Sequence, residues 1–193
     1  MTVPFPANLV GTLFGKGAEA SAIHAPGVMP ASPVAYHPAG TEIYAQGEAA
    51  GSLYQIEFGS VRVYRLLADG RRQISAFHLA GEVFGFEADG THHFFAEAVE
   101  ATGIRVLRLS SSADLSRELL PLALQSLVKA QEHLLVLGRQ SAVERIAAFL
   151  LDMDERQGGL DRIELPMTRM DIADYLGLTI ETVSRTFTKL SPH

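Results

Sequence analysis

The sequence predicts an α+β fold in which an all-β half is followed by helices. Three observations support this: short β-branched and aromatic runs between turn residues, a long series of leucines and alanines spaced three and four apart, and two helical segments joined by a glycine. We expect four parts: a poorly ordered arm over residues 1–33, a β-domain over 34–110, a long helix over 111–138, and a helix-turn-helix domain over 139–193.

The composition excludes several classes of protein. The 193 residues include no cysteine, which excludes disulfides, thiolate-bound zinc, cysteine-ligated iron–sulfur clusters and a catalytic thiol. No stretch approaches the roughly 20 apolar residues of a membrane span, and the N-terminus has no signal-peptide pattern. A net charge of −6 argues against nonspecific coating of nucleic acid. We therefore expect a cytoplasmic protein without membrane contact, in which any contact with DNA is local.

The arm and the β-domain differ in their turn chemistry. Proline, glycine, alanine and serine dominate residues 1–33, a composition that rarely builds a regular element. In the next part, turn residues recur about every 8 to 12 positions, which is typical of an antiparallel sandwich or barrel. The strands that we expect cover residues 41–45, 52–58, 60–66, 73–79, 94–99 and 103–109. The pair Asp69-Gly70 between two of these runs predicts a hairpin.

The long helix carries an apolar stripe with the spacing of a coiled-coil seam. Its members are Leu120, Ala123, Leu127, Ala130, Leu134 and Leu137. This pattern predicts a parallel dimer interface, while packing of the stripe on the chain's own β-domain is the alternative. Pro121 fits the first turn of the helix, where its missing N–H costs little.

A further helix and a short strand follow. We expect the helix to bury an apolar face and to end at the Gly158-Gly159 pair. Its apolar residues are Val143, Ile146, Ala147, Leu150 and Leu151. Residues 160–165 then fit a short strand that Pro166 ends.

The last segment carries a cap, a turn and a second cap in the order that a helix-turn-helix requires. Thr168 can cap a helix whose Asp171 has the capping-box spacing, Gly177 supplies a left-handed turn, and Thr179 can cap a second helix that runs to about Leu190. The apolar residues that would hold the two helices together are Ile172, Ala173, Leu176, Leu178, Val183 and Phe187.

The second of these helices has the side chains of a base-reading surface. Arginine can donate twice to guanine, glutamate can accept from cytosine N4, and serine can meet a base edge or a phosphate. The residues that we expect to contact DNA are Thr168, Arg169, Thr179, Ile180, Glu181, Thr182, Ser184, Arg185 and Lys189. The alternative is a small helical bundle whose polar face is merely solvated.

Residues 171–185, with the sequence DIADYLGLTIETVSR, resemble the signature of the CRP/FNR family of bacterial regulators, and most closely its FixK-like branch. The resemblance continues in the β-domain at residues 38–44 (PAGTEIY), 59–64 (GSVRVY) and 81–85 (GEVFG). It implies a cyclic-nucleotide-binding-like β-roll, also described as a double-stranded β-helix, followed by a dimerisation helix. It also implies an activator that contacts RNA polymerase, and a homodimer that binds double-stranded DNA at a palindrome with TTGA-type half-sites. Glu181, Ser184 and Arg185 match the base-contacting residues of the family.

In cyclic-AMP-binding relatives, two short segments hold the phosphate of the nucleotide, and this sequence differs from them in one of the two. Such relatives have a Gly-Glu step followed later by Arg-Ser or Arg-Thr. Gly81-Glu82 is present here, but residues 92–96 are HHFFA, which replaces the guanidinium by apolar bulk. We therefore expect neither a cyclic nucleotide nor another cofactor, with a regulator gated by an unidentified small effector in the β-roll as the alternative.

Histidines raise the possibility of a metal or haem site. The adjacent His92 and His93 would point to opposite faces of a strand, and the other histidines are scattered, so we expect loop or surface histidines and no metal site. A cupin-like metal-binding protein is a further alternative, but the required His-x-His pattern with a spaced glutamate is missing. No Walker loop or G-x-S-x-G elbow is present, and we expect no catalysis.

Family members continue after the recognition helix into a β-hairpin wing that contacts phosphates. The sequence ends at residues 190–193 (LSPH), before such a wing. Because phosphate contacts supply much of the affinity for DNA, we expect weaker and more salt-sensitive binding without it.

Overall fold

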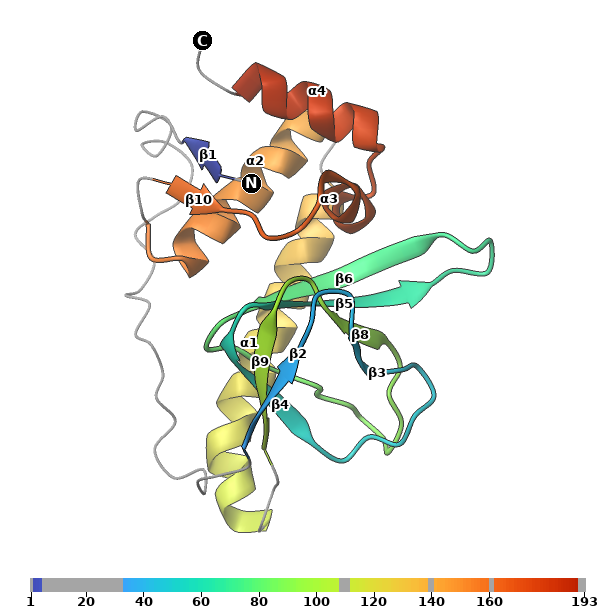
Figure 1. The fold of residues 1–193 in the computed structure, drawn as a ribbon, viewed down its shortest axis with the longest axis vertical. Coiled ribbons are helices and arrows are strands. Elements are labelled where there is room, and N and C mark those ends of the chain that lie inside the picture. The colour runs from blue at the N-terminus through green and yellow to red at the C-terminus, as the bar shows by residue number, and fades with distance from the viewer. Residues whose placement is uncertain (1, 5–32, 108–111, 139–140, 160–161, 191–193) are drawn as a thin grey trace. The chain divides into compact units, whose positions relative to one another are not determined.

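The computed structural model describes residues 2–4, 33–107, 112–138, 141–159 and 162–190 (Figure 1). The chain divides into two compact units. One comprises Ile23–Leu135, and the other comprises Met1–Ala22 together with Val136–His193. None of the described helices is both long and apolar enough to cross a bilayer.

The first unit contains two antiparallel four-stranded sheets. One sheet has the order β2 (Val34–His37), β9 (Thr102–Leu107), β4 (Leu53–Phe58) and β7 (Val83–Phe84). The other has the order β3 (Glu42–Tyr44), β8 (Phe95–Ala98), β5 (Ser60–Leu66) and β6 (Arg72–Leu79). The six strands expected from the sequence are confirmed.

The core of this unit lies between the two sheets, because each sheet contributes buried side chains to one apolar cluster. Its buried members are Tyr44, Ile56, Val61, Val63, Phe84, Ala96 and Ile104. Alternate residues of β5 enter it, as the two-residue period of a strand requires.

The hairpin between β5 and β6 closes at the predicted Asp-Gly pair. Gly70 has a positive φ of 82° and donates its N–H to the Leu67 carbonyl at 2.9 Å. The Asp69 carboxylate accepts hydrogen bonds from the backbone and side chain of Arg71.

Two strands of this unit, β2 and β7, were not expected. β7 has only two residues, too few for an alternating pattern. β2 follows Pro33 and precedes Pro38, and it lies at a sheet edge where only β9 pairs with it. Three of its four residues are exposed, so no buried face imposed an alternation on its sequence.

Helix α1 (Ser112–Leu137) is the long helix expected after the β-domain. Its bounds agree with the expected span of 111–138, but the expectation that Pro121 lies in the first turn is wrong, because Pro121 lies inside the helix. The helix therefore lacks the backbone hydrogen bond that a non-proline residue would donate at this position.

The second unit contains three helices and a two-stranded ribbon among its described residues. These are α2 (Ala142–Arg156), α3 (Arg169–Leu176), α4 (Ile180–Leu190), and β10 (Arg162–Glu164) paired with β1 (Thr2–Pro4). The short strand before Pro166 is thus confirmed. The expectation that residues 1–33 hold no regular element is wrong for β1, which pairs antiparallel with β10. Residues 5–32 of that arm lie outside the described residues.

The buried face of α2 differs from the one expected. Ile146, Phe149, Leu150 and Met153 are buried and follow the spacing of one helical face. In contrast, Val143 is 45% exposed and Leu151 is 37% exposed. Leu151 lies five residues after Ile146, a rotation of about 140° that takes it off the face contacting α4 and β10.

We expect Met153→Ala to lower the free energy of unfolding by about 2–5 kcal/mol, because it leaves a cavity under a fully buried side chain. The matched control is Leu151→Ala on the same helix, for which we expect a loss below about 1 kcal/mol. Urea unfolding followed by circular dichroism measures both. Equal losses of unfolding free energy in the two variants would contradict the assignment of Met153 to the buried face of α2 and of Leu151 to its exposed side.

Candidate nucleic-acid interface

Helix α3 begins with the predicted capping box. The Thr168 hydroxyl accepts the Asp171 N–H at 3.1 Å, and the Asp171 carboxylate accepts the Thr168 N–H at 3.0 Å. The Thr168 hydroxyl also donates to this carboxylate at 2.7 Å. Asp171 is buried, so the cap satisfies a carboxylate that would otherwise be costly. Arg169, the first residue of α3, is exposed.

The corner between α3 and α4 has the expected left-handed glycine. Gly177 has φ 61° and ψ 41°, and its N–H donates to the Ala173 carbonyl, as does the N–H of Leu178 at 3.0 Å. One contact was not expected from the sequence: Arg145 Nη1, on α2, donates to the Leu176 carbonyl at 3.0 Å. The sequence does hold one indication of this contact: Arg145 lies close to the N-terminus of α2, where the helix dipole disfavours a cation, so its charge has reason to be directed elsewhere.

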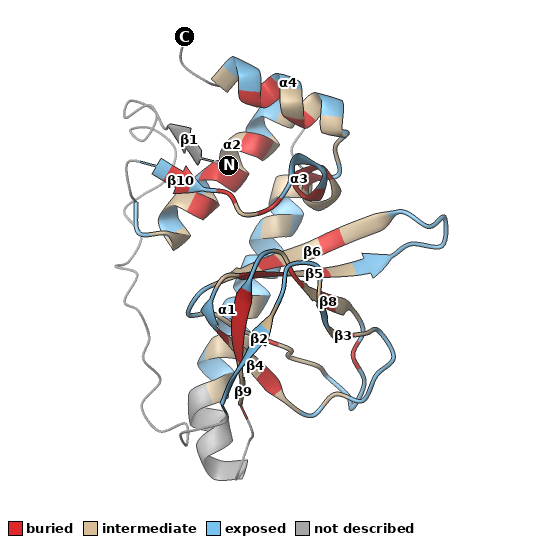
Figure 2. Ribbon diagram, in the orientation of Figure 1, coloured by how far each residue is buried: buried red, intermediate tan, exposed pale blue. Residues whose placement is uncertain are grey.

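The inner face of α4 is buried against the rest of the unit (Figure 2). Val183 and Phe187 were expected there, and Thr186 joins them, with its hydroxyl donating to the Thr182 carbonyl at 2.9 Å. Of the remaining residues expected to hold the helices together, Ile172, Ala173 and Leu176 are buried and Leu178 is half-buried. The two helices are therefore held as the sequence predicted.

The outer face of α4 presents polar side chains. Glu181, Arg185 and Lys189 are exposed and recur four residues apart, while Ser184 and Ile180 are half-buried. At the start of the helix, the exposed Thr179 accepts the N–H of Thr182, itself half-buried, at 3.2 Å. Figure 2 shows exposed and half-buried segments alternating with buried ones along α4.

Local contacts lower the pKa of the Glu181 carboxyl. Its own backbone N–H, the Thr179 side chain and the charge of Arg185 hold its pKa below the ordinary value, in that order of importance. Because the group is exposed, this reflects the helix N-terminus more than any tertiary contact. At neutral pH the surface therefore carries an acceptor at Glu181 and donors at Arg185 and Lys189.

The stripe expected on α1 lies open in the single chain. Leu120, Leu127 and Leu134 are each more than half exposed. Ala130 is exposed, whereas Ala123 and Leu137 are half-buried. Three further exposed residues widen the stripe: Leu124, Val128 and Leu135.

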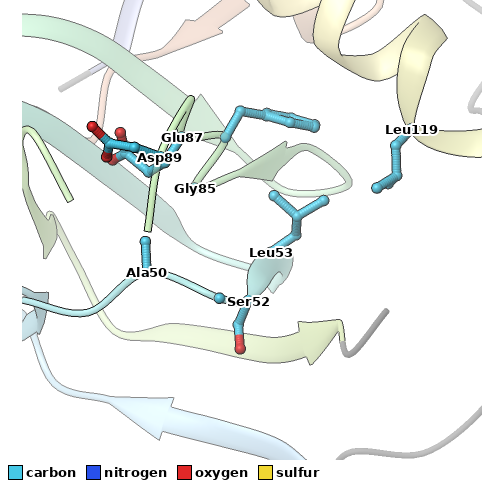
Figure 3. Close-up of a pocket in the computed structure, with 9 residues that line it drawn as sticks. Ala50, Ser52, Leu53, Gly85, Glu87, Asp89 and Leu119 are labelled. Atoms are coloured by element: carbon cyan, nitrogen blue, oxygen red, sulfur yellow. The ribbon is translucent and has the colours of Figure 1, made fainter. Parts of the chain in front are cut away.

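The β-domain has a small pocket next to α1 (Figure 3). Its volume is about 230 Å³, below the roughly 300–1,000 Å³ of typical ligand sites. Glu87 and Asp89 supply its charged side chains, and Leu53, Phe86 and Leu119 line its apolar part. Two carboxylates make the pocket unfavourable for an anion.

The segments that hold a phosphate in cyclic-AMP-binding relatives are used differently here. The Glu82 carboxylate accepts hydrogen bonds from Lys129 Nζ at 2.7 Å and from the Leu79 N–H at 3.2 Å. Phe94 packs against the apolar cluster of the β-domain, and Phe95 stacks on Tyr64. The segment 92–96 thus fills space with aromatic rings and contains no guanidinium.

The histidine pair is only partly as expected. Both histidines lie in the loop between β7 and β8, as expected, and His93 is exposed. His92 is not at the surface: it is 2% exposed and stacks on Tyr44 with ring centroids 3.7 Å apart. His92 Nδ1 forms a hydrogen bond with Glu87 Oε1 at 3.2 Å. Burial, followed by the charge of Glu87, raises the pKa of Tyr44 well above its usual range. Within the described ranges, no three His, Asp or Glu side chains cluster as a metal site would need.

Comparison with known proteins identifies both units. Residues 34–116 match the family model of the cyclic nucleotide-binding domain, and residues 144–192 match that of the Crp-like helix-turn-helix domain. The nitrogen fixation regulation protein FixK of Rhizobium meliloti strain 1021 is 60% identical over 157 residues, which are 81% of this chain and 74% of the relative. The chain belongs to the CRP/FNR family, in its FixK-like branch.

Two further CRP/FNR proteins extend the comparison. The structure of FixK2 from Bradyrhizobium japonicum superposes with a TM-score of 0.75 at 44% identity, covering 81% of this chain and 83% of that one. The transcriptional activatory protein AadR of Rhodopseudomonas palustris strain CGA009 is 39% identical over 77% of this chain and 66% of its own length. The family consists of transcriptional regulators and not of enzymes. This chain is a regulator that binds DNA through its helix-turn-helix.

We expect Thr168→Ala to lower the free energy of unfolding by about 0.5–2 kcal/mol, because it removes the cap of α3 and a hydrogen bond to buried Asp171. Thr168→Ser keeps the oxygen and is the matched control, with a loss below about 0.5 kcal/mol. Urea unfolding measures both. Unchanged stability of Thr168→Ala would contradict the capping role of Thr168.

Proposed function

We propose that this regulator acts as a homodimer that binds a palindrome with TTGA-type half-sites, each read by one copy of α4. The observation that carries the proposal is the outward position of Glu181 and Arg185 on a helix whose opposite face is buried. A buried inner face leaves these side chains, with Ser184 between them, as the surface that can enter a major groove.

The chemistry of these side chains suits the proposed half-site. TTGA contains one G·C pair, which is the only pair there with guanine O6 and N7 acceptors and a cytosine N4 donor. Arg185 can donate to the guanine, and the ionised Glu181 can accept from the cytosine. Thr168, Arg169, Thr179, Thr182 and Lys189 lie at helix starts or at the end of α4, where we assign them to phosphates.

The apolar stripe on α1 supports the homodimer. Leu127 and Leu134 are 53% and 67% exposed, and neighbouring large apolar side chains extend the same helical stripe. Burying such a stripe against a second copy removes apolar surface from water at about 25 cal/mol per Å². A two-fold dimer then places two copies of α4 on two related half-sites, which accounts for a palindrome.

We further propose that the regulator works in the cytoplasm without a cyclic nucleotide, an iron–sulfur cluster or another cofactor. The engaged Glu82, the rings of Phe94 and Phe95, and the acidic lining of the small pocket all disfavour a bound cyclic phosphate. The absence of cysteine from the sequence disfavours the cluster. By resemblance to its family and to the activatory relative, we assign it the role of an activator that contacts RNA polymerase.

We expect Arg185→Ala to weaken binding to the TTGA-type palindrome by about 1–3 kcal/mol and to reduce the preference at the G·C pair. Lys189→Ala is the comparison: as a phosphate contact it should weaken all sequences alike and reduce the salt slope by about one. Fluorescence anisotropy titrations on matched and mismatched DNA at two salt concentrations measure both. A uniform loss for Arg185→Ala would assign it to a phosphate and refute its role at the base.

We expect the double variant Leu127→Glu, Leu134→Glu to be monomeric, because four carboxylates would meet across the seam of a dimer. Both side chains are exposed in the single chain, so the helix itself should tolerate the change. Gln125→Glu, exposed on another side of α1, is the control and should leave the mass of a dimer. Light scattering gives the mass, and an unchanged mass of the double variant would end the dimer proposal.

A further inference from the structure

The carbonyl at the end of α3 has a charged donor from another helix. Leu176 is the last residue of α3, and its carbonyl is one of those that lack an intrahelical partner. Arg145 Nη1 donates to it at 3.0 Å across 31 positions of sequence. Hydrogen bonds from a guanidinium are stronger than those between neutral groups, and Arg145 is half-buried, which limits competition from water.

The position of Arg145 on α2 indicates that its charge stabilises the C-terminal end of α3 and not α2 itself. Arg145 is the fourth residue of α2, close to the helix N-terminus, where the dipole disfavours a cation. The preceding residue, Glu144, carries the charge that this end favours and completes the capping box with Ser141. At the C-terminal end of α3 the same dipole argument favours a cation, and the guanidinium of Arg145 lies there.

The guanidinium also lies beside the residue at which the chain turns. A Cβ built on Gly177 would lie 3.7 Å from Arg145 Nη1 and 3.8 Å from Leu137 Cδ2, so both side chains lie near the corner. Phe149 of α2 packs on Tyr175 of α3 with ring centroids 5.7 Å apart. Ring contacts such as this one are weakly directional, whereas the hydrogen bond from Arg145 to the Leu176 carbonyl is directional.

We propose that Arg145 is a positioning residue for base recognition: it holds the corner between α3 and α4 and so sets the position at which α4 presents Glu181 and Arg185. The inference rests on the proposed function. Arg145 acts through Leu176 and Gly177, and α4 begins at Ile180, three residues after that glycine. It is not on the outer face of α4 and contacts no base in this role.

A displaced corner would harm recognition more than overall affinity. Base-edge hydrogen bonds require donor–acceptor distances near 2.7–3.2 Å, and a shift of α4 by about 1 Å breaks their geometry. Contacts with phosphates are less directional and survive such a shift. Loss of Arg145 should therefore lower discrimination between sequences while leaving the salt dependence of binding unchanged.

The test compares Arg145→Met, which keeps an apolar stem, with Arg145→Lys, which keeps a donor. Arg156→Met is the matched control on the same helix, because Arg156 pairs with Asp152 at 3.0 Å one turn earlier. The readout is the ratio of dissociation constants for the TTGA-type palindrome and for the same DNA with its G·C pairs replaced. It is measured at two salt concentrations, and thermal unfolding of each variant is recorded in parallel.

For the wild type and Arg156→Met we expect discrimination of at least about tenfold. For Arg145→Met we expect at most about a third of that ratio, with Arg145→Lys within about threefold of the wild type and the same salt slope in all four proteins. Unchanged discrimination in Arg145→Met would overturn the proposal. A salt slope smaller by about one in that variant would also overturn it, because it would show a direct phosphate contact.

Two outcomes separate this inference from the proposed function. If the wild type itself does not discriminate, the proposed function fails and the inference fails with it. If the wild type discriminates and Arg145→Met does so equally, only the inference fails. Should Arg145→Met unfold below the assay temperature, Arg145→Lys decides, since loss of discrimination in that folded variant would overturn the proposal.

Discussion

The burial of one face of α4 is the constraint on which the rest of the DNA-binding unit depends. Val183 and Phe187 are buried against α2 and α3, and a full burial of such side chains is worth about 1.5–3 kcal/mol each. A helix of 11 residues would be marginal in water by itself, so this packing holds it together. Because a helix repeats every 3.6 residues, the same packing turns Glu181 and Arg185 outward.

Polar side chains at the helix ends add specific hydrogen bonds to the packing of the apolar face. Ser141 and Thr168 each start a helix with a capping box, and Thr179 caps the start of α4. Between them, Gly177 makes the turn and Arg145 satisfies the carbonyl of Leu176. With both ends of α3 occupied by specific hydrogen bonds, the length of the corner and the start of α4 are defined.

The β-domain matches the cyclic nucleotide-binding domain family, and aromatic side chains fill much of its interior. Tyr44 and His92 stack in its core, and Glu87 binds His92, so aromatic rings and a carboxylate occupy this region. The chain as a whole carries a net charge of −6. Attraction to phosphate therefore depends on the few cations near α4, such as Arg185 and Lys189, and not on the overall field of the protein.

The sequence by itself determined the elements whose signals are local. The capping box of Thr168, the left-handed Gly177 and the Asp69-Gly70 hairpin were all predicted, because each depends on the conformational preference of a few neighbouring residues. The periodic apolar residues of α4 likewise predicted its inner face. From these, the outward position of Glu181 and Arg185 followed.

Only the tertiary structure decided features that depend on contacts between distant segments. The face of α2 with Met153 buried and Leu151 exposed, the pairing of β1 with β10, and the burial of His92 each depend on which surfaces meet. The contact of Arg145 with Leu176 joins residues 31 positions apart, and no local pattern specifies its partner. Local propensity selects a helix, a turn or a cap, but the choice of partner is a property of the packed chain.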